Sequence, residues 1–338
     1  MPADEFGKAD SFGFGKIDSA KHLKNKSVKE KETESGAEKG NMDEAEKESY
    51  LKAGKIAQQV IKFAKGFIKK DMLLIDVAEK IEGKIIELGG AIAFPVNTSI
   101  DEVTAHYTPS KNDLLKATGL LKIDLGVEVN GFIADCAFSF DFSEDGRYKD
   151  MIKMNETILE SVLAELKVGS PVKIIGNKIS DMLKGSGYQV IKNLAGHSLA
   201  KDDIHPGLTV SNYRNENNFE LSKIAIAIEP FLTIDDAAGE IYEGKTSEIY
   251  VLQQDKMPRD REARKLLEFV KENYRTKPFC KRWLEKAGLT KFNFALVTLI
   301  REGILYNFPV LIEKQKKPVS QFEHSVIFAD KVYVTTRG

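Results

Sequence analysis

The sequence predicts an α+β fold built around one main sheet, and three observations lead to this prediction. Segments with helical periodicity alternate with short strand-like runs in two rounds along the chain. The dipeptide Asn130-Gly131 joins two apolar-rich arms, which is a typical signal of a β-hairpin. After Pro258, three short amphipathic segments interrupt the second round. Such runs of strands with separate runs of helices are typical of an α+β domain.

The composition allows most of the chain to fold around a hydrophobic core. Of the 338 residues, 42% are hydrophobic and 30% are charged, and the net charge is −1. This balance argues against an overall basic nucleic-acid-binding protein. The two cysteines, Cys136 and Cys280, lie far apart and suit a reducing cytoplasm better than a disulfide framework. The sequence has neither an apolar run of about 18 residues nor a secretory leader, so we expect no membrane association.

Residues 1–41 form a charged N-terminal extension that is poor in apolar residues and rich in Lys, Glu, Ser and Gly. Such a segment cannot bury enough apolar surface to offset the loss of conformational entropy, so we expect it to be disordered. It would serve either as a solubilising tail or as a segment that docks on an RNA or ribosomal surface. We expect the folded domain to extend over residues 42–338.

Apolar residues at helical spacing predict two helices at the start of the folded region, over residues 42–68 and 72–90. The glycine pair Gly89-Gly90 ends the second helix. A strand and loop at 91–110 and the hairpin at 121–140 follow. The other elements expected before Pro258 are helices over 149–166 and 171–187 and strands over 188–197, 221–231 and 246–254.

Three short amphipathic helices are expected within residues 258–303, and strands at 309–314 and 319–329 complete the second round. Residues 258–302 contain 12 Lys or Arg and 6 Asp or Glu. This basic excess is typical of a solvated helical face, and it is also compatible with a surface that contacts nucleic acid.

Each arm of the hairpin carries one aspartate on a face that otherwise has small or polar residues, because alternate residues of a strand share a face. With Asn130-Gly131 as a two-residue turn, Asp124 pairs with Ala137, and Asp135 lies diagonally from Asp124. Two carboxylates at this spacing repel each other unless a cation lies between them.

Two later strands repeat this pattern. Glu229 shares a strand face with alanines, and Glu323 shares one with Gln321 and Ser325. His197 adds an imidazole. A single acid on a strand usually faces solvent, but four carboxylates and one imidazole in such settings predict a site for two divalent cations. Mn²⁺, Fe²⁺, Co²⁺ and Zn²⁺ all suit these ligands, and a water between two such ions becomes a hydroxide nucleophile near neutral pH.

The ordered set of these five residues resembles the ligand set of the methionine aminopeptidases. The surrounding strings AFPVNTSIDEVTAHYTPS, KIDLGVEVNGFIADCAF, NLAGHSL, AIEPF and QFEHSVI are also similar, and the resemblance extends from Met42 to the C-terminus. It implies the pita-bread fold. The 94 positions between Glu229 and Glu323 resemble type 2, archaeal and eukaryotic enzymes, which carry a winged-helix-like helical insert here. We assign that insert to residues 255–312 of the catalytic domain.

The resemblance implies a metal-binding role for each matched residue. Asp124 would chelate one ion, and Asp135 and Glu323 would bridge both ions. His197 and Glu229 would hold the second ion. Glu229 would also move a proton from the attacking water to the leaving amine.

The resemblance also implies residues that bind substrate. His106 and His205 match two histidines that are not ligands and that hydrogen-bond the scissile carbonyl, the oxyanion or the adjacent peptide group. Phe94, Ile204 and Phe308 stand at positions that line the pocket for the methionine side chain.

The implied activity is removal of the initiator methionine from nascent polypeptides with a small second residue, by attack of a hydroxide that bridges two metal ions. The family suggests a cytoplasmic monomer that associates transiently with the ribosome. One alternative is a metal-free pita-bread protein that binds RNA or ribosomes, but such a protein has no reason to keep all five ligands. The other is a proline dipeptidase, which normally carries a folded N-terminal domain that residues 1–41 cannot supply.

Overall fold

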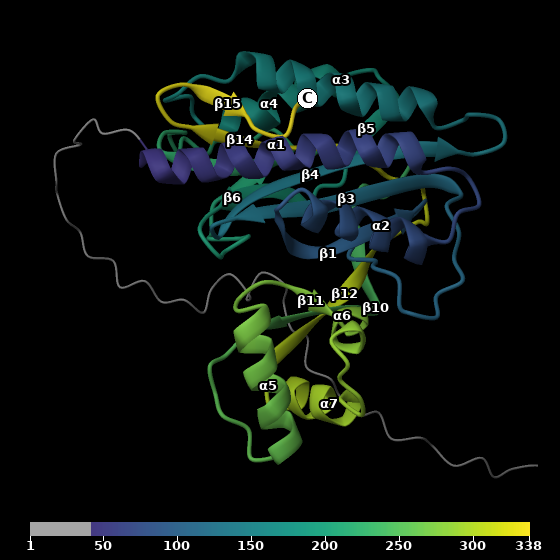
Figure 1. Cartoon of the computed structure of the whole chain (residues 1–338). Helices are drawn as coiled ribbons and strands as arrows, with labels where there is room; N and C mark the ends of the chain where they lie inside the picture. The colour runs from purple at the N-terminus through teal and green to yellow at the C-terminus, as the bar shows by residue number, and fades with distance from the viewer. Residues whose placement is uncertain (1–41) are drawn as a thin grey trace, which may run out of the picture. The chain divides into compact units, whose positions relative to one another are not determined.

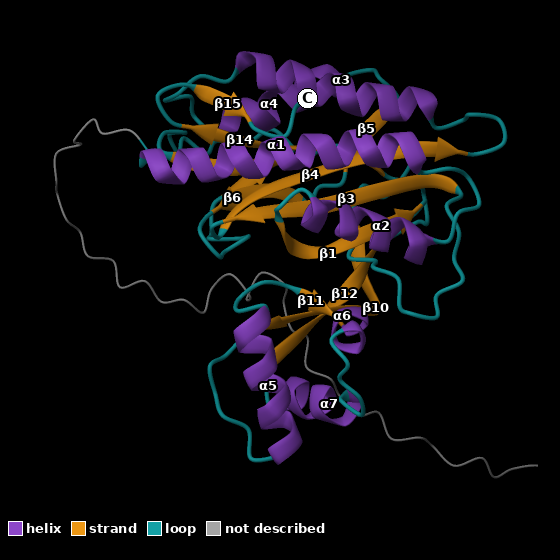
Figure 2. Cartoon of the chain, in the orientation of Figure 1, coloured by secondary structure: helices purple, strands orange, loops and turns teal. Residues whose placement is uncertain are grey.

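The computed structural model describes residues 42–338 (Figures 1 and 2). The expected disorder of residues 1–41 lies outside the described residues. The helices are α1 (Glu44–Phe67), α2 (Leu74–Glu87), α3 (Lys149–Glu165), α4 (Lys173–Leu183), α5 (Arg261–Asn273), α6 (Lys281–Lys286) and α7 (Asn293–Arg301). The strands are β1 (Ala91–Ile100), β2 (Val103–Ala105), β3 (Gly119–Val129), β4 (Phe132–Phe142), β5 (Tyr188–Val190), β6 (Ala195–Leu199), β7 (Thr209–Ser211), β8 (Ile224–Ile228), β9 (Phe231–Ile234), β10 (Ile241–Leu252), β11 (Phe279–Cys280), β12 (Leu305–Glu313), β13 (Ser320–Gln321), β14 (Glu323–Phe328) and β15 (Val332–Val334).

The largest sheet has eight antiparallel strands in the order β1-β3-β4-β14-β8-β6-β7, with β15 paired to β14. This sheet is the main one that the sequence predicts. Two smaller sheets, β11-β10-β12-β2 and β13-β9-β5, were not predicted. Several of their strands have only two to four residues, which is too short for a period of two to be recognised. The helices and strands together confirm the α+β prediction.

The hairpin of β3 and β4 has the predicted register. Asn130 has φ 55° and Gly131 has φ 91°, as a two-residue type I′ turn requires. Pairing runs without a shift from the turn to the open ends of the arms, and it places Asp124 opposite Ala137 and Gly126 opposite Asp135. No bulge therefore moves either aspartate to the other face.

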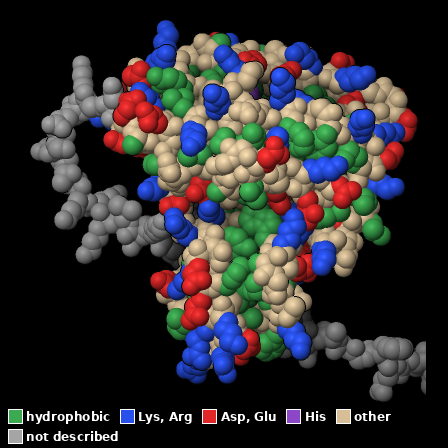
Figure 3. All heavy atoms as spheres, in the orientation of Figure 1, with side chains coloured by type: hydrophobic (Ala, Val, Ile, Leu, Met, Phe, Trp, Pro, Cys, Tyr) green, Lys and Arg blue, Asp and Glu red, His purple; other side chains and the backbone are tan. Residues whose placement is uncertain are grey.

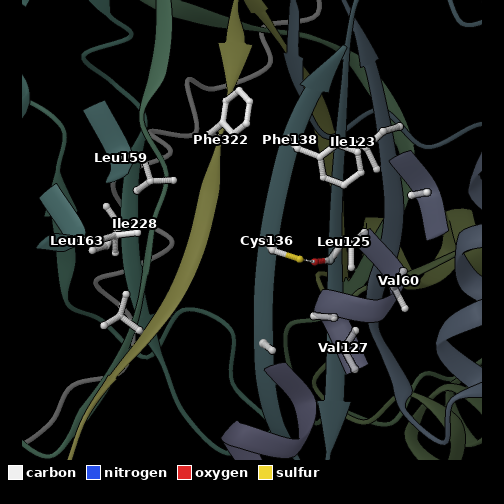
Figure 4. Close-up of a cluster of buried hydrophobic side chains, with 14 of the residues drawn as sticks. Val60, Ile123, Leu125, Val127, Cys136, Phe138, Leu159, Leu163, Ile228 and Phe322 are labelled. Atoms are coloured by element: carbon white, nitrogen blue, oxygen red, sulfur yellow. Dashed lines mark hydrogen bonds between the residues drawn. The ribbon is translucent and has the colours of Figure 1, made fainter. Parts of the chain in front are cut away.

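The helices α1–α4 pack on the apolar face of the eight-stranded sheet (Figures 1 and 2). In Figure 4, Leu125 and Val127 of β3 lie beside Cys136 and Phe138 of β4 in this core. The Cys136 thiol donates to the carbonyl oxygen of Leu125 at 3.5 Å, and this cysteine is a small buried residue of the core. Because the helices cover this face, the acidic residues are left on the opposite one.

The three helices predicted within residues 258–303 are confirmed as α5, α6 and α7. They pack around a core of their own, which includes Leu267, Val270, Leu284 and Leu299. Lys and Arg side chains gather at the end of this helical segment in Figure 3, in keeping with its basic composition. Within residues 42–338, no helix combines the length and the apolar character needed to span a membrane.

Two glycines of α1 provide a matched test of how the C-terminal segment packs on this helix. A Cβ atom at Gly54 would lie 2.4 Å from the Thr335 carbonyl oxygen, whereas one at Gly66 would meet nothing within 4 Å. We expect Gly54→Ala to destabilise the fold by about 1–3 kcal/mol through overpacking. Gly66→Ala should stabilise it by about 0.5–1 kcal/mol, because alanine loses less backbone entropy in a helix. Urea unfolding measures both changes, and equal stability of the two variants would contradict this packing.

Candidate metal centre

The five predicted ligand side chains gather on one face of the eight-stranded sheet. Asp124 on β3, Ala137 on β4 and Glu323 on β14 form one row of directly opposed residues. Directly opposed residues point their side chains to the same face. The small Ala137 thus leaves open space between two carboxylates, and Asp135 lies on the same face two residues before it.

A second row brings in the imidazole. His197 on β6 lies opposite Ala227 on β8, and Ala227 lies opposite Ser325 on β14. Again an alanine occupies the middle of the row and leaves space. Glu229 follows β8 two residues after Ala227, so it extends from the same face.

The distances between these side chains are short. The His197 Nε2 atom lies 3.7 Å from Asp135 Oδ2 and 3.7 Å from Glu229 Oε1. One ligand atom each from Asp135, His197 and Glu323 lies within 4.8 Å of the other two. A single cation can therefore contact atoms from all three residues.

Gln321 connects the remaining two carboxylates of the cluster. Its Nε2 atom donates to Asp124 Oδ2 at 3.4 Å and to Glu229 Oε2 at 3.5 Å. The sequence placed Gln321 on the acidic face but gave it no role. Its position beside Glu323 was the available signal, since a buried amide next to acids usually donates to them.

The residues present fit a bound cation by a second criterion. Among the described residues, Asp124 Oδ1, Asp135 Oδ1 and Glu323 Oε1 are buried oxygen atoms without a hydrogen-bond partner. Buried polar atoms in native proteins nearly always have partners, so each exception requires an explanation. Oxygen atoms with free lone pairs that face one another are the ligands that a hard or borderline divalent cation prefers.

The carboxyl groups are difficult to ionise without a cation. Burial raises the pKa of Asp124 to about 7. Burial also raises the pKa of Asp135, Glu229 and Glu323 well above their usual ranges, and neighbouring carboxylates raise each further. Several ionisable groups with strongly shifted pKa values in one place are typical of functional sites.

His197 is prepared to act as a ligand in its neutral form. Its Nδ1 atom lies 3.1 Å from the Ser198 carbonyl oxygen, which can only accept, so the proton sits on Nδ1. The lone pair on Nε2 then faces the acids. Burial lowers the pKa of this imidazole to about 4, so the ring is neutral at pH 7.

Two serines hold the acidic strands in place where the sheet opens. The β4–β14 ladder has only two paired rows. Ser325 Oγ accepts from Asp135 N at 2.7 Å and donates to Asp135 O at 2.9 Å. Ser139 Oγ makes the equivalent pair of bonds to the Gln321 backbone. These hydroxyls replace missing ladder bonds on both sides of the cluster.

The two predicted non-ligand histidines lie in different surroundings. The His205 ring is 4.1 Å from the His197 ring in an edge-on contact. His106 adopts φ 62°, its Nδ1–H donates to the Pro309 carbonyl oxygen at 3.2 Å, and its ring lies 5.2 Å from that of Phe308. Burial lowers the pKa of His106 to about 4, so its Nε2 atom can only accept a hydrogen bond at neutral pH.

The three predicted pocket residues do not all lie together. Phe94 and Ile204 share one apolar cluster with Ile133, which adjoins Asp135 on β4. Phe94 packs so closely over Gly126 that a Cβ atom there would lie 2.4 Å from its ring. Phe308 is outside this cluster and contacts His106 and Tyr306 instead.

Comparison with known families and relatives gives a consistent result. Residues 48–270 match the model of metallopeptidase family M24. A methionine aminopeptidase from Pyrococcus abyssi is 40% identical over 86% of this chain and 99% of the relative. One from Methanocaldococcus jannaschii is 37% identical over 86% and 98%.

Solved structures share the fold at low sequence identity. A thermophilic Arx1 superposes with a TM-score of 0.74 at 14% identity, covering 87% of this chain and 91% of that one. The methionine aminopeptidase of Thermotoga maritima gives 0.59 at 16% identity, covering 88% and 98%. The prolidase of Pyrococcus horikoshii gives 0.55 at 15% identity, covering 88% and 63%. These likenesses show the fold alone.

The raised pKa of Asp124 makes the stability of the metal-free protein, prepared with a chelator, depend on pH. A carboxyl with a folded pKa above its unfolded value stabilises the fold below about pH 4, and this contribution is lost as pH rises through about 7. We therefore expect the metal-free protein to unfold at a lower temperature at pH 7.5 than at pH 5.5. Added Mn²⁺ should raise the unfolding temperature more at pH 7.5, since protons compete with the metal.

The Asp124→Asn variant is the control for this pH effect, because it lacks the titrating group. Its unfolding temperature, measured by calorimetry with chelator, should change less between the two pH values. An equal change in both proteins would contradict the raised pKa.

Proposed function

The chain belongs to metallopeptidase family M24, and we propose on that basis that it is a methionine aminopeptidase, a hydrolase that removes methionine from polypeptide N-termini. The observation that carries the proposal is the cluster of unpartnered carboxylate oxygens beside a neutral histidine on one sheet face. Relatives of nearly the same length carry this name at up to 40% identity.

Five residues would hold the divalent metal ions that the family requires: Asp124, Asp135, His197, Glu229 and Glu323. We propose two ions, and Mn²⁺, Fe²⁺, Co²⁺ and Zn²⁺ all suit this oxygen-rich set. When bound, such ions polarise a carbonyl and lower the pKa of water. The two-ion arrangement is supported by the charge balance, because four carboxylates neutralise two divalent cations.

Glu229 is our candidate for the proton transfer. Burial and the neighbouring Asp124 and Asp135 raise the pKa of its carboxyl, so it holds a proton more readily than an exposed glutamate does. A group of this kind can accept a proton from water and then donate it to the leaving amine. Gln321 keeps the Glu229 carboxyl oriented by donating to Oε2.

His106 and His205 would orient the substrate. Because the Nδ1–H of His106 donates to Pro309, its Nε2 atom offers an acceptor, which suits a peptide N–H of the substrate and not a carbonyl. We assign contact with the scissile carbonyl or the oxyanion to His205, whose ring adjoins the ligand His197.

The methionine side chain would occupy the apolar region next to the acids. Phe94 and Ile204 belong to the apolar cluster on the Asp135 side of the site, and this supports their place in the pocket. Phe308 would close the pocket from the side of His106. We propose initiator methionine followed by a small residue as the substrate class.

The finer cellular assignments are also proposals. We propose a cytoplasmic monomer that meets nascent chains, with transient association with the ribosome. The segment 255–312 is proposed as a winged-helix-like insert in a catalytic domain of residues 42–338. The metal-free binding protein and the proline dipeptidase are less favoured, because relatives that match this chain over nearly their whole length are named methionine aminopeptidases.

An assay of two peptides distinguishes these activities. With Mn²⁺ or Co²⁺ present, we expect the protein to release free methionine from Met-Ala-Ser and to leave an X-Pro dipeptide intact. Chelator should abolish the release, and added metal should restore it. Release from the X-Pro dipeptide alone would indicate a proline dipeptidase, and no turnover with any metal would favour a binding protein.

Asp135→Asn tests the ligand assignment. We expect this variant to keep its fold and to lose bound metal and activity together, with kcat reduced by at least about 100-fold, because metal chemistry contributes several kcal/mol. The matched control is Asp236→Asn, since Asp236 is an exposed aspartate paired only with Lys317 in the described chain. Normal turnover by Asp135→Asn would show that the ligand assignment is wrong.

A further inference from the structure

A buried ion pair outside the metal centre joins α2 to α6. Glu82 and Arg282 are only 3% and 2% exposed. Arg282 Nη1 donates to Glu82 Oε2 at 2.5 Å, and Nη2 donates to Oε1 at 2.9 Å. Trp283 Nε1 also donates to Glu82 Oε2, at 3.0 Å. The bidentate geometry leaves neither charge unpaired, as such burial requires.

The same guanidinium also reaches the loop that carries His106. Arg282 Nη2 donates to Thr108 Oγ1 at 3.2 Å, and Nε donates to the Pro109 carbonyl oxygen at 3.2 Å. The Thr108 hydroxyl in turn donates to the Val96 carbonyl oxygen at 2.9 Å. Arg282 therefore holds the second and third residues after His106, although it is 174 positions away from Thr108.

The network also connects the loop to strand β1. The Val96 amide donates to Glu82 Oε1 at 3.4 Å, and the Thr98 amide donates to the Tyr107 carbonyl oxygen at 2.7 Å. Residues 107, 108 and 109 are thus each bonded to β1 or to Arg282. A displacement of the guanidinium would remove a hydrogen bond from two of these three residues, Thr108 and Pro109, at once.

His106 depends on such support because of its backbone. A residue other than glycine at φ 62° is held there only when its surroundings determine the conformation. The ring is held on its Nδ1 side by the hydrogen bond to the Pro309 carbonyl oxygen. The direction of Nε2 is therefore set by the backbone on the C-terminal side of His106 as well as by Pro309.

We propose that Arg282 is a positioning residue for His106, which it holds in place through Thr108 and Pro109. This inference rests on the proposed function, in which His106 binds the substrate. It gives the helical segment α5–α7 a role in the reaction, although that segment contributes none of the proposed ligands. Lysine at position 282 would keep a charge for Glu82, but it lacks the planar fork that reaches carboxylate and loop together.

The test compares four variants of the full chain: Arg282→Lys, Thr108→Val, His106→Ala and the double variant Arg282→Lys/His106→Ala. Lys286→Ala is the matched control, since Lys286 of α6 forms a half-exposed pair with Glu79 of α2 at 2.8 Å. Two readouts are needed. One is kcat and KM for Met-Ala-Ser with metal, and the other is hydrogen exchange of the Thr98 amide, which donates to the Tyr107 carbonyl oxygen, in the metal-free protein.

We expect Arg282→Lys to lower kcat/KM by about 10- to 100-fold, since small displacements of a positioning group have effects of this size. Thr108→Val should act in the same direction, and Lys286→Ala should stay within about twofold of wild type, as expected for a surface pair. When His106 is already alanine, Arg282→Lys should change kcat/KM by less than about twofold, because coupled residues are not additive. Exchange of the Thr98 amide should be faster in Arg282→Lys, because its acceptor, the Tyr107 carbonyl oxygen, lies in the loop that Arg282 holds.

Two results would overturn the proposal. The first is a loss of kcat/KM from Arg282→Lys that is as large in the His106→Ala background as in the wild-type background. This would show that Arg282 acts elsewhere. The second is unchanged exchange of the Thr98 amide in both Arg282→Lys and Thr108→Val. If wild type releases no methionine while exchange responds as expected, the proposed function fails and the placement of the loop by Arg282 is supported. If Arg282→Lys does not fold, Thr108→Val decides by the same readouts.

Discussion

The mutual repulsion of four carboxylates on one sheet face is the constraint on which the rest of this structure depends. Asp124, Asp135, Glu229 and Glu323 are all desolvated, and the pKa of each carboxyl is raised by burial. A sheet would normally avoid such a face. It is maintained here because α1–α4 bury the opposite face, which fixes which side of each strand faces the acids.

Small residues and hydroxyl groups make this acidic face geometrically feasible. Ala137 lies between Asp124 and Glu323 in one row, and Ala227 lies opposite His197 in the other. No large side chain therefore separates the ligand atoms. Ser325 holds Asp135 across the point where the β4–β14 ladder ends. Hydrogen bonds also hold the backbone beyond the acidic face, where Arg282 bonds the loop after His106 to the surrounding helices and strand.

The sequence predicts those parts of the site that depend on local patterns. The Asn130-Gly131 turn and strict alternation were enough to place Asp124 and Asp135 on one face in the correct register. A donor role of Gln321 had a local signal, but which two acids it contacts could not be foreseen, because that depends on how distant strands meet. The pair of Glu82 and Arg282 is separated by 200 positions and has no local signal. Short strands such as β11 were also missed, because two residues show no period.

The central claim is that burial and mutual repulsion make the carboxyl groups of this face bind protons more tightly than exposed ones, and that divalent cations displace these protons. Calorimetric titration of Mn²⁺ into the metal-free protein, in two buffers of different ionisation enthalpy near pH 7, measures the protons released per bound ion. The account predicts saturable binding with proton release that decreases as the pH is raised. Saturable binding without proton release, or no binding at all, would contradict it.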